Sequence, residues 1–310
     1  MISTIGYWTL RCVCFLLSLL PLRALYVLSD LMAWTARVVV GYRREVVRRN
    51  LRESFPDRDD RWLADVERRF YRFLGDVAVE TVKMASISQA VMRRRMKFEN
   101  VELIEDALKN GRNCSVMLGH YCNWEWVSSL PMWLSDAGVA GQIYHPLENR
   151  AFDRLMLHLR GRFGAHSISM ADTLPTVLEW RRKGRPSVVG YIADQVPGYH
   201  GIHLFVDFLH HDTPVFTGAE RISRMLDASM VYARITRPKR GHYICRFEEI
   251  SADVSDEERF APTRRYFELL EAQIEECPEY WLWSHRRWKR DRRGFMEYHG
   301  KDAERQLRRL

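Results

Sequence analysis

The hydrophobic pattern of the first part of the chain differs from that of the rest. Residues 12–22 (CVCFLLSLLPL) carry no charge and lie between Arg11 and Arg23. A helix of this length rises only about 16 Å, which is shorter than the ~30 Å hydrocarbon core of a bilayer. A continuous helix would span only if it tolerated Arg23 and continued toward Arg37, and Pro21 would bend it. The pattern predicts an apolar helical segment that either spans a membrane or lies flat on it.

A basic segment follows the apolar one. Residues 41–52 (GYRREVVRRNLR) are rich in arginine, and basic residues just beyond an apolar segment mark the cytoplasmic side and bind anionic headgroups. A secretory signal is not expected, because no basic residue precedes Arg11 and no clear small-x-small cleavage site follows. The alternative is a buried amphipathic helix followed by a solvated basic one. We expect residues 1–55 to form a membrane-associated helical anchor with a basic flank.

From residue 59 the apolar positions recur at helical spacing. The segment DDRWLADVERRFYRFLGDVAVETVKM places five large side chains on one face, which predicts a long amphipathic helix: Trp62, Val66, Phe70, Phe73 and Val77. An aromatic stripe of this kind usually packs into a core. Trp281 and Trp283 are likewise expected in the core.

From about residue 96, short apolar segments alternate with helical patterns. Strands are expected at residues 114–119, 139–144, 186–192, 229–236 and 243–250. Helices are expected at 100–111 and 123–134, each behind an Asn cap, and at 151–164, 173–184, 218–226 and 257–276, the last interrupted near Pro262. This alternation favours an α/β fold with a mostly parallel central sheet flanked by helices. Because no linker interrupts it, residues 56–310 are expected to form a single domain.

One stretch, SVMLGHYCNWEW, places a histidine at the end of an expected strand. In such sheets, ligands bind beyond the carboxyl ends of the strands. Asn123 would cap the helix that follows, and Glu125 would lie in its first turn, where its carboxylate can fold back to the His120 imidazole. A histidine held by a carboxylate is a general base. On spacing alone, a core histidine near a surface carboxylate is at least as well supported.

Four further residues are candidates for substrate binding, together with Asn123. Asp194 and Gln195 follow the strand at 186–192, so they should face the same cleft as the histidine, although an Asp shortly before Pro-Gly also suits a turn. Arg154 and Arg160 lie on the helix at 151–164 and could bind phosphates, although solvated arginines are commoner.

Histidines also gather in GYHGIHLFVDFLHHDT, but they lack the spacing of a tetrahedral metal site. We interpret them as loop residues and expect no metal: His200, His203, His210 and His211.

The net charge of +8 and the pI near 9.3 favour acidic partners, which are anionic lipid, nucleic acid or an acidic carrier protein. The basic tail from Arg286 to Arg309 suits the same partners. A basic peripheral protein without catalysis is one alternative. The sequence contains no recognised nucleic-acid-binding motif, so nucleic acid is not an expected partner.

Four ordered blocks carry a resemblance. GHYCNWEW resembles the HxxxxD/E motif of the glycerolipid acyltransferase superfamily, and most closely that of the late acyltransferases of lipid A biosynthesis. IYHPLENRAFDRL (143–155), GYIADQVPG (190–198) and PEYWLWSHRRWKR (278–290) are similar to three later blocks of that family. His145 departs from the pattern, because many members have arginine there. Glu125 in place of Asp fits the lipid A branch better.

The resemblance implies an O-acyltransferase at the cytoplasmic face of a bacterial inner membrane. His120, oriented by Glu125, would deprotonate a 3-hydroxyl on an acyl chain of a lipid A precursor. The alkoxide would attack an acyl carrier protein thioester, and backbone amides near Asn123 or Trp124 would hold the oxyanion. No cofactor is implied. The expected partners are the carrier protein, the precursor and an anionic membrane surface; an aminolipid, a glycolipid or a lysophospholipid is the alternative acceptor.

Overall fold

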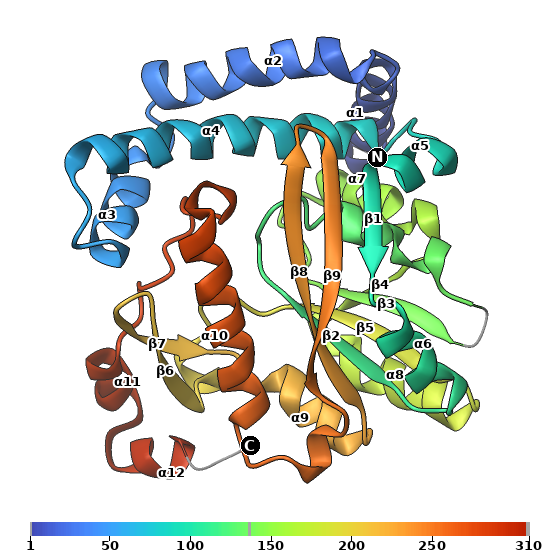
Figure 1. The fold of residues 1–310 in the computed structure, drawn as a ribbon, viewed down its shortest axis with the longest axis vertical. Helices are drawn as coiled ribbons and strands as arrows, with labels where there is room; N and C mark the ends of the chain where they lie inside the picture. The colour runs from blue at the N-terminus through green and yellow to red at the C-terminus, as the bar shows by residue number, and fades with distance from the viewer. Residues whose placement is uncertain (1, 136–137, 308–310) are drawn as a thin grey trace.

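The computed structural model describes residues 2–135 and 138–307, and Figure 1 shows its fold. Within this part of the chain, seven strands form one sheet in the order β1-β9-β8-β2-β5-β3-β4. All neighbours pair in parallel except β8 and β9, which form an antiparallel hairpin. The α/β class and the mostly parallel sheet are thereby confirmed. The strands are β1 Met96–Glu99, β2 Cys114–Leu118, β3 Val139–Tyr144, β4 His166–Ser169, β5 Ser187–Ile192, β8 Ser229–Lys239 and β9 His242–Ser251.

Helices pack around this sheet, and one long pair, α2 and α4, lies side by side beyond the tip of the β8–β9 hairpin (Figure 1). The helices of the described residues are α1 Ile2–Ser18, α2 Leu22–Trp34, α3 Arg44–Ser54, α4 Asp60–Lys83, α5 Gln89–Arg95, α6 Glu102–Lys109, α7 Arg150–Arg160, α8 Thr173–Arg182, α9 Gly218–Met225, α10 Ala261–Glu276, α11 Arg292–His299 and α12 Ala303–Leu307. The apolar face expected for α4 is confirmed, since Val66, Phe70, Phe73 and Val77 are buried and Trp62 is half-buried.

The N-terminal apolar segment forms two helices rather than one. Pro21 precedes the first residue of α2, and the chain bends by 115° between Ile5–Ser18 and Leu22–Val39. Among the described residues, no single helix is long and apolar enough to cross a membrane, whereas this bent pair passes the same test together. The expected bend at Pro21 is confirmed.

The outer surface of α1, α2 and the π-helical turn Thr35–Val39 is strongly apolar. Most of the exposed large hydrophobic side chains in the described chain lie between residues 5 and 42, among them Leu16, Val27, Leu31 and Trp34, which are 62%, 71%, 58% and 56% exposed. Exposed apolar side chains in this number are uncommon on soluble monomeric proteins.

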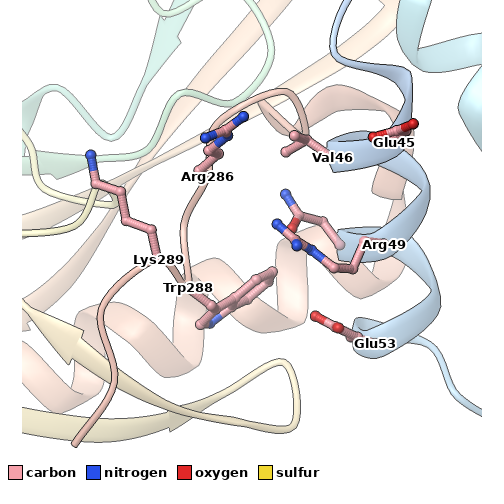
Figure 2. Close-up of a pocket in the computed structure, with 8 residues that line it drawn as sticks. Glu45, Val46, Arg49, Glu53, Arg286, Trp288 and Lys289 are labelled. Carbon is pink, nitrogen blue, oxygen red and sulfur yellow. The ribbon is translucent and has the colours of Figure 1, made fainter. Parts of the chain in front are cut away.

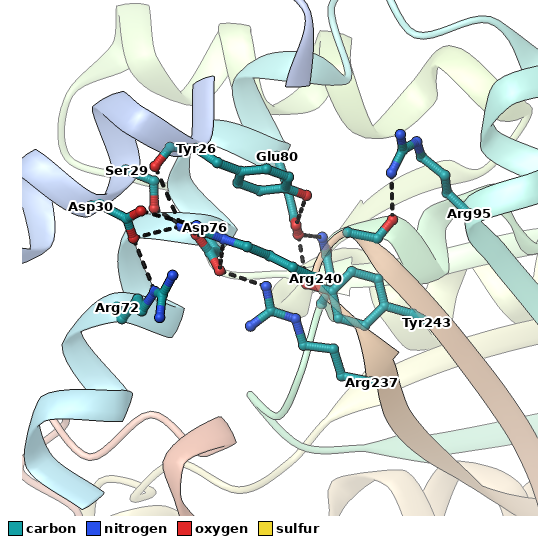
Figure 3. A network of polar contacts seen from close by, with 12 residues as sticks. Tyr26, Ser29, Asp30, Arg72, Asp76, Glu80, Arg95, Arg237, Arg240 and Tyr243 are labelled. Atoms are coloured by element: carbon teal, nitrogen blue, oxygen red, sulfur yellow. Dashed lines mark hydrogen bonds and ion pairs between the residues drawn. The ribbon is translucent and has the colours of Figure 1, made fainter. Parts of the chain in front are cut away.

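The inner side of α2 packs tightly on α4. Gly75 permits the approach, because a Cβ atom there would lie 2.8 Å from the Ser29 carbonyl oxygen. Polar contacts then tie both helices to the tip of the β8–β9 hairpin (Figure 3). Arg237 and Arg240 pair with the buried Asp76 of α4, which also accepts a hydrogen bond from the Ser29 hydroxyl at 2.6 Å. A buried carboxylate is tolerated when it is paired in this way, so the network fixes α2 to the body of the protein.

Three local expectations are corrected. Asn100 does not cap α6; it adopts a left-handed φ of 57°, and its side chain donates to the Phe247 carbonyl at 3.0 Å. Pro262 does not interrupt a helix, because α10 begins beside it, where a proline loses no backbone hydrogen bond. The segment at 123–134 is mainly the 3₁₀ helix Trp126–Trp133 rather than an α-helix.

A second sheet was not expected. β6 Leu204–Phe208 and β7 His211–Val215 form an antiparallel hairpin within the histidine-rich segment interpreted above as loop. Leu209 and His210 make its two-residue turn with φ of 52° and 63°. Asn and Gly are the usual residues at these angles, so the turn leaves no sequence signal.

Candidate functional site

His120 lies directly beyond the carboxyl end of β2, as expected, and its partner is the Asp194 carboxylate. Asp194 follows β5, the strand hydrogen-bonded to β2. Its Oδ1 lies 2.7 Å from His120 Nδ1, and its Oδ2 accepts the His120 backbone N–H at 2.8 Å. An ionised carboxylate only accepts hydrogen bonds, so Nδ1 carries the proton and Nε2 offers its lone pair. The imidazole is therefore held in the tautomer that a general base needs.

Asp194 is buried and remains ionised. Burial opposes its charge, but the His120 ring, the two His120 hydrogen bonds and the Trp281 indole N–H outweigh burial and lower the pKa of Asp194 to about 2. The indole donates to Oδ2 at 2.8 Å. Gly119 leaves room for this carboxylate, because a Cβ atom there would lie 3.3 Å from Oδ2 and 2.8 Å from Leu270. All these contacts are internal, so the buried Asp194 is placed to orient the histidine. The substrate-binding role expected for it stays a prediction.

Glu125 does not fold back to the imidazole, which corrects the expected His120–Glu125 contact. Both of its oxygens accept hydrogen bonds from the Arg160 guanidinium, at 2.6 and 2.7 Å. The arginine reaches it from the end of α7. A two-pronged arginine–carboxylate pair is strong and strictly oriented, and it leaves the place beside His120 Nδ1 to Asp194.

Glu125 contacts His120 indirectly, through Trp124. The Trp124 indole N–H donates to Glu125 Oε1 at 3.2 Å, and its ring packs edge-on against the imidazole with centroids 5.3 Å apart. The pair of Glu125 and Arg160 therefore positions one wall of the site around the histidine.

The Asn123 side chain Oδ1 accepts the Trp126 backbone N–H at 3.0 Å, but the N-cap position of the following 3₁₀ helix is occupied by Glu125, which corrects the expected cap. The Asn123 Nδ2 donates to the Glu80 carboxylate at 2.6 Å, and that carboxylate also accepts the hydroxyl groups of Tyr26 and Tyr243 (Figure 3). Asn123 is completely buried. Its side chain is therefore structural, which corrects its expected role in substrate binding, and it ties the turn after His120 to α4 and α2.

The C-terminal segment 278–281 holds the turn from the other side. The Cys122 backbone N–H donates to the Tyr280 carbonyl at 2.9 Å, and Tyr121 pairs with Trp281 in an isolated β-bridge. Cys122 has a left-handed φ of 50°, an unfavourable conformation for a side chain that tight packing maintains. Sequence reasoning placed Trp281 in the core, where it is, but missed its contact with Asp194. The resemblance of PEYWLWSHRRWKR to a family block was the only signal.

The Arg287 guanidinium lies close enough to Asp194 for their charges to interact. Arg287 is fully buried; one nitrogen donates to the Pro214 carbonyl at 2.9 Å, while its Nε and Nη1 have no partner in the described structure. Burial lowers the pKa of Arg287 to about 10, and the nearby Asp194 charge opposes that effect. Arg287 thus supplies positive charge close to the dyad, a role that the sequence analysis did not foresee.

Stability is expected to fall on acidification because of His285. Burial lowers its pKa from 6.5 to about 4. Between these values the unfolded chain binds a proton that the folded chain refuses, so stability is complete above pH 6.5 and is lost as pH falls through 4. Partial exposure reduces the effect to about 2 kcal/mol. Urea unfolding at pH 7.5 and 4.5 checks this: His285→Gln should flatten the dependence, and the exposed His145→Gln should not. Equal slopes in all three proteins would contradict it.

The structure places only some of the other expected residues in the site. Gln195 lies in the site, with its Nε2 3.3 Å from His120 Nε2. Arg154 does not join it: its guanidinium stacks over Tyr7 of α1 at 4.2 Å. Arg160 lies at the site, but the Glu125 carboxylate already neutralises its charge. The described residues contain no group of three His, Cys, Asp or Glu side chains suited to a metal ion.

Taken together, the arrangement can accept a proton at His120 Nε2 and stabilise the resulting imidazolium with the Asp194 carboxylate. It lacks a Ser or Cys nucleophile hydrogen-bonded to the ring among the described residues, since the ring nitrogens contact only Asp194 and Gln195.

Comparison with known proteins gives matches that cover almost the whole chain. The family model described as bacterial lipid A biosynthesis acyltransferase matches residues 1–290. A lipid A biosynthesis acyltransferase of Haemophilus influenzae is 22% identical over 284 residues, which cover 90% of this chain and 86% of that protein.

Proposed function

Since the chain belongs to the bacterial lipid A biosynthesis acyltransferase family, as its motifs indicated, we propose that it transfers an acyl chain from acyl carrier protein to a hydroxyl group of a lipid A precursor. The His120–Asp194 dyad is the observation that carries this proposal. It provides a base and no protein nucleophile, which suits direct transfer from a thioester to an acceptor hydroxyl.

In the proposed reaction, the acceptor hydroxyl displaces the Gln195 amide from His120 Nε2 and gives its proton to that nitrogen. The alkoxide oxygen bonds to the thioester carbon, and the tetrahedral intermediate collapses with cleavage of the C–S bond. The departing thiolate takes the proton from Nε2, which regenerates the neutral imidazole. Asp194 stabilises the transient imidazolium. Backbone N–H groups of Asn123 and Trp124 are the proposed oxyanion donors.

Glu125 and Arg160 have a positioning role in this proposal. Their pair holds Trp124 against the imidazole, and Arg160 brings α7 to the site. Asp194 takes over the orienting role that the family motif had suggested for Glu125. The mechanism requires no metal or cofactor beyond the thioester.

We also propose that residues 1–55 attach the enzyme to the cytoplasmic face of the inner membrane, and that residues 56–310 form the catalytic domain. The exposed apolar surface of α1 and α2 supports attachment, and Arg23 and Arg43 beside it favour anionic lipid.

Replacing apolar side chains on this surface should release the protein from membranes. Leu16→Asp with Leu31→Asp removes two exposed anchors and adds two negative charges, so binding to vesicles containing anionic lipid should fall about tenfold or more. Flotation with such vesicles measures it. Met225→Asp with Met296→Asp, on exposed methionines elsewhere, is the matched control. If both pairs behaved alike, α1 and α2 would not form the membrane-binding surface.

The proposed activity is tested with purified protein, an acyl carrier protein thioester and a tetra-acylated lipid A precursor. Formation of a product heavier by one acyl chain supports it, and no transfer contradicts it. Mass spectrometry of lipids from a deletion strain identifies the acceptor in the cell. Unchanged lipid A with a change in an aminolipid, glycolipid or lysophospholipid would move the activity to that acceptor.

A further inference from the structure

A cationic cavity lies between α3 and the C-terminal segment that reaches the dyad. It is a half-open hollow of about 440 Å³, lined by Arg43, His285, Arg286 and Lys289. This volume falls within the range of about 300–1,000 Å³ typical of small-molecule sites. A neighbouring hollow of about 750 Å³ shares Arg286 and Lys289 and adds Arg49 and Trp288 (Figure 2). All the side chains of the first cavity are basic.

Hydrogen bonds hold the walls of the cavity in place. Asn50 of α3 donates to the carbonyl groups of Trp283 and His285, both at 2.9 Å, and Arg43 donates to the Ser284 carbonyl at 3.0 Å. These contacts clamp residues 283–285 against α3. The positive side chains therefore extend from a backbone that these hydrogen bonds hold in place.

The charges of this cavity are not neutralised. Other arginines of the same region are paired, for example Arg44 and Arg48 with Glu67. In the described structure, Arg43, Arg286 and Lys289 of this cavity have no ion pair, and neither has Arg49 of the neighbouring hollow. Glu45 and Glu53 line only the neighbouring hollow, where Glu53 contacts His211. Uncompensated positive charges in one cavity repel one another, and a bound anion removes that cost.

Two side chains of this segment hold buried nitrogen atoms without a hydrogen-bond partner in the described structure. They are Nε2 of His285, a residue that lines the cavity, and Nε and Nη1 of the fully buried Arg287, which lines neither hollow. Buried polar groups normally have a partner. These nitrogen atoms show that the segment carrying Arg286 and Lys289 holds polar groups whose hydrogen bonds the described protein groups do not supply.

The segments that line the cavity continue toward the reacting groups on one side and toward the apolar surface on the other. Trp281, four residues before His285, donates to Asp194. Arg43 directly follows a segment whose Val39, Val40 and Tyr42 are exposed. An amphiphile that binds the exposed Val40 and Tyr42 would bring its headgroup close to Arg43.

We propose that the cavity formed by Arg43, His285, Arg286 and Lys289 binds a phosphate group of a substrate of the proposed acyl transfer. Arginine and lysine together suit a phosphate, through paired N–H donors and a point charge. The inference rests on the proposed function for the identity of the substrate. The adjoining apolar surface favours the phosphate of the lipid acceptor; the phosphodiester of the carrier protein's thiol arm is the other source.

Binding is measured first without turnover. Inorganic phosphate is titrated calorimetrically into the full chain carrying His120→Ala, in detergent micelles. Saturable binding is expected, weakened about tenfold or more by adding Arg286→Gln and Lys289→Gln. The control adds Arg246→Gln and Arg265→Gln, which remove two exposed charges elsewhere. No saturable binding, or equal loss in the control, overturns the site whether or not the protein is an acyltransferase.

Steady-state kinetics of the otherwise unaltered enzyme then identify the source. If Arg286→Gln with Lys289→Gln raises KM for the lipid acceptor about tenfold and leaves KM for the thioester donor unchanged, the phosphate belongs to the acceptor. The reverse pattern assigns it to the carrier protein's arm. If neither KM changes, the site does not serve the reaction and the proposal is wrong. If the unaltered enzyme is inactive toward this acceptor, the proposed function is wrong. The outcome of the phosphate titration does not depend on that result.

Discussion

Replacing His120 with alanine is expected to lower kcat for acyl transfer by about a thousandfold or more. The variant has no group that can take the acceptor's proton, and proton transfer together with the loss of the oriented dyad accounts for effects of this size. Initial rates with saturating thioester and lipid acceptor measure it. KM for the acceptor should change little, because the imidazole acts on the hydroxyl mainly in the transition state.

Two comparisons separate this result from unfolding. His158→Ala removes an exposed histidine of α7 and should retain transfer. Circular dichroism and urea unfolding of the His120 variant should show a folded protein, since Asp194 keeps its hydrogen bonds from the backbone N–H of residue 120 and from Trp281. Transfer close to the wild-type rate would remove His120 from the mechanism.

Replacing Asp194 with asparagine is expected to lower kcat by at least about a hundredfold. An amide can donate to His120 Nδ1, which places the ring proton on Nε2 and leaves no lone pair for the acceptor hydroxyl. Glu125→Gln should cost less, because a glutamine oxygen still accepts from Arg160. The matched pair of variants tests which carboxylate orients the base. If the glutamine variant were the more damaged, Glu125 would be that carboxylate, as the family motif implied.

The asparagine variant should also be less stable at neutral pH. The pKa of Asp194 lies near 2 in the folded protein against an ordinary value of 3.8. A depressed pKa means that the ionised form stabilises the fold above pH 3.8, and this contribution is lost as pH falls through 2. It amounts to about 2 kcal/mol. Urea unfolding at pH 7 of Asp194→Asn and of the unaltered protein measures this loss.

Periodicity in the sequence was enough to identify most elements of the sheet. The run 114–118 is completely buried because neighbouring strands and helices cover both faces, and such a strand appears as an uninterrupted apolar segment. The stripe on α4 was equally clear. Because β2 and β5 both end near motif residues, the sequence also indicated that His120 and Asp194 share one edge of the sheet.

Some elements left no signal in the sequence. The β6–β7 hairpin turns through Leu209 and His210, whose conformation depends on tertiary contacts; the buried Leu209 backbone N–H, for example, donates to Glu271 at 2.6 Å. Periodicity also did not predict the short edge strand β4 or the 3₁₀ helix after Glu125. The conformation of each depends more on the elements packed against it than on its own residues.

The sequence by itself determined the fold class, the bend at Pro21 and the family, because these depend on periodicity, local backbone chemistry and ordered motifs. The tertiary structure decided which carboxylate meets the histidine. Asp194 lies 74 residues from His120 along the chain, and parallel pairing of β2 with β5 brings it there, while Arg160 from α7 takes Glu125 away. Spacing within a motif shows which groups are close along the chain. Which carboxylate pairs with the histidine depends on how distant strands and helices pack in the folded protein.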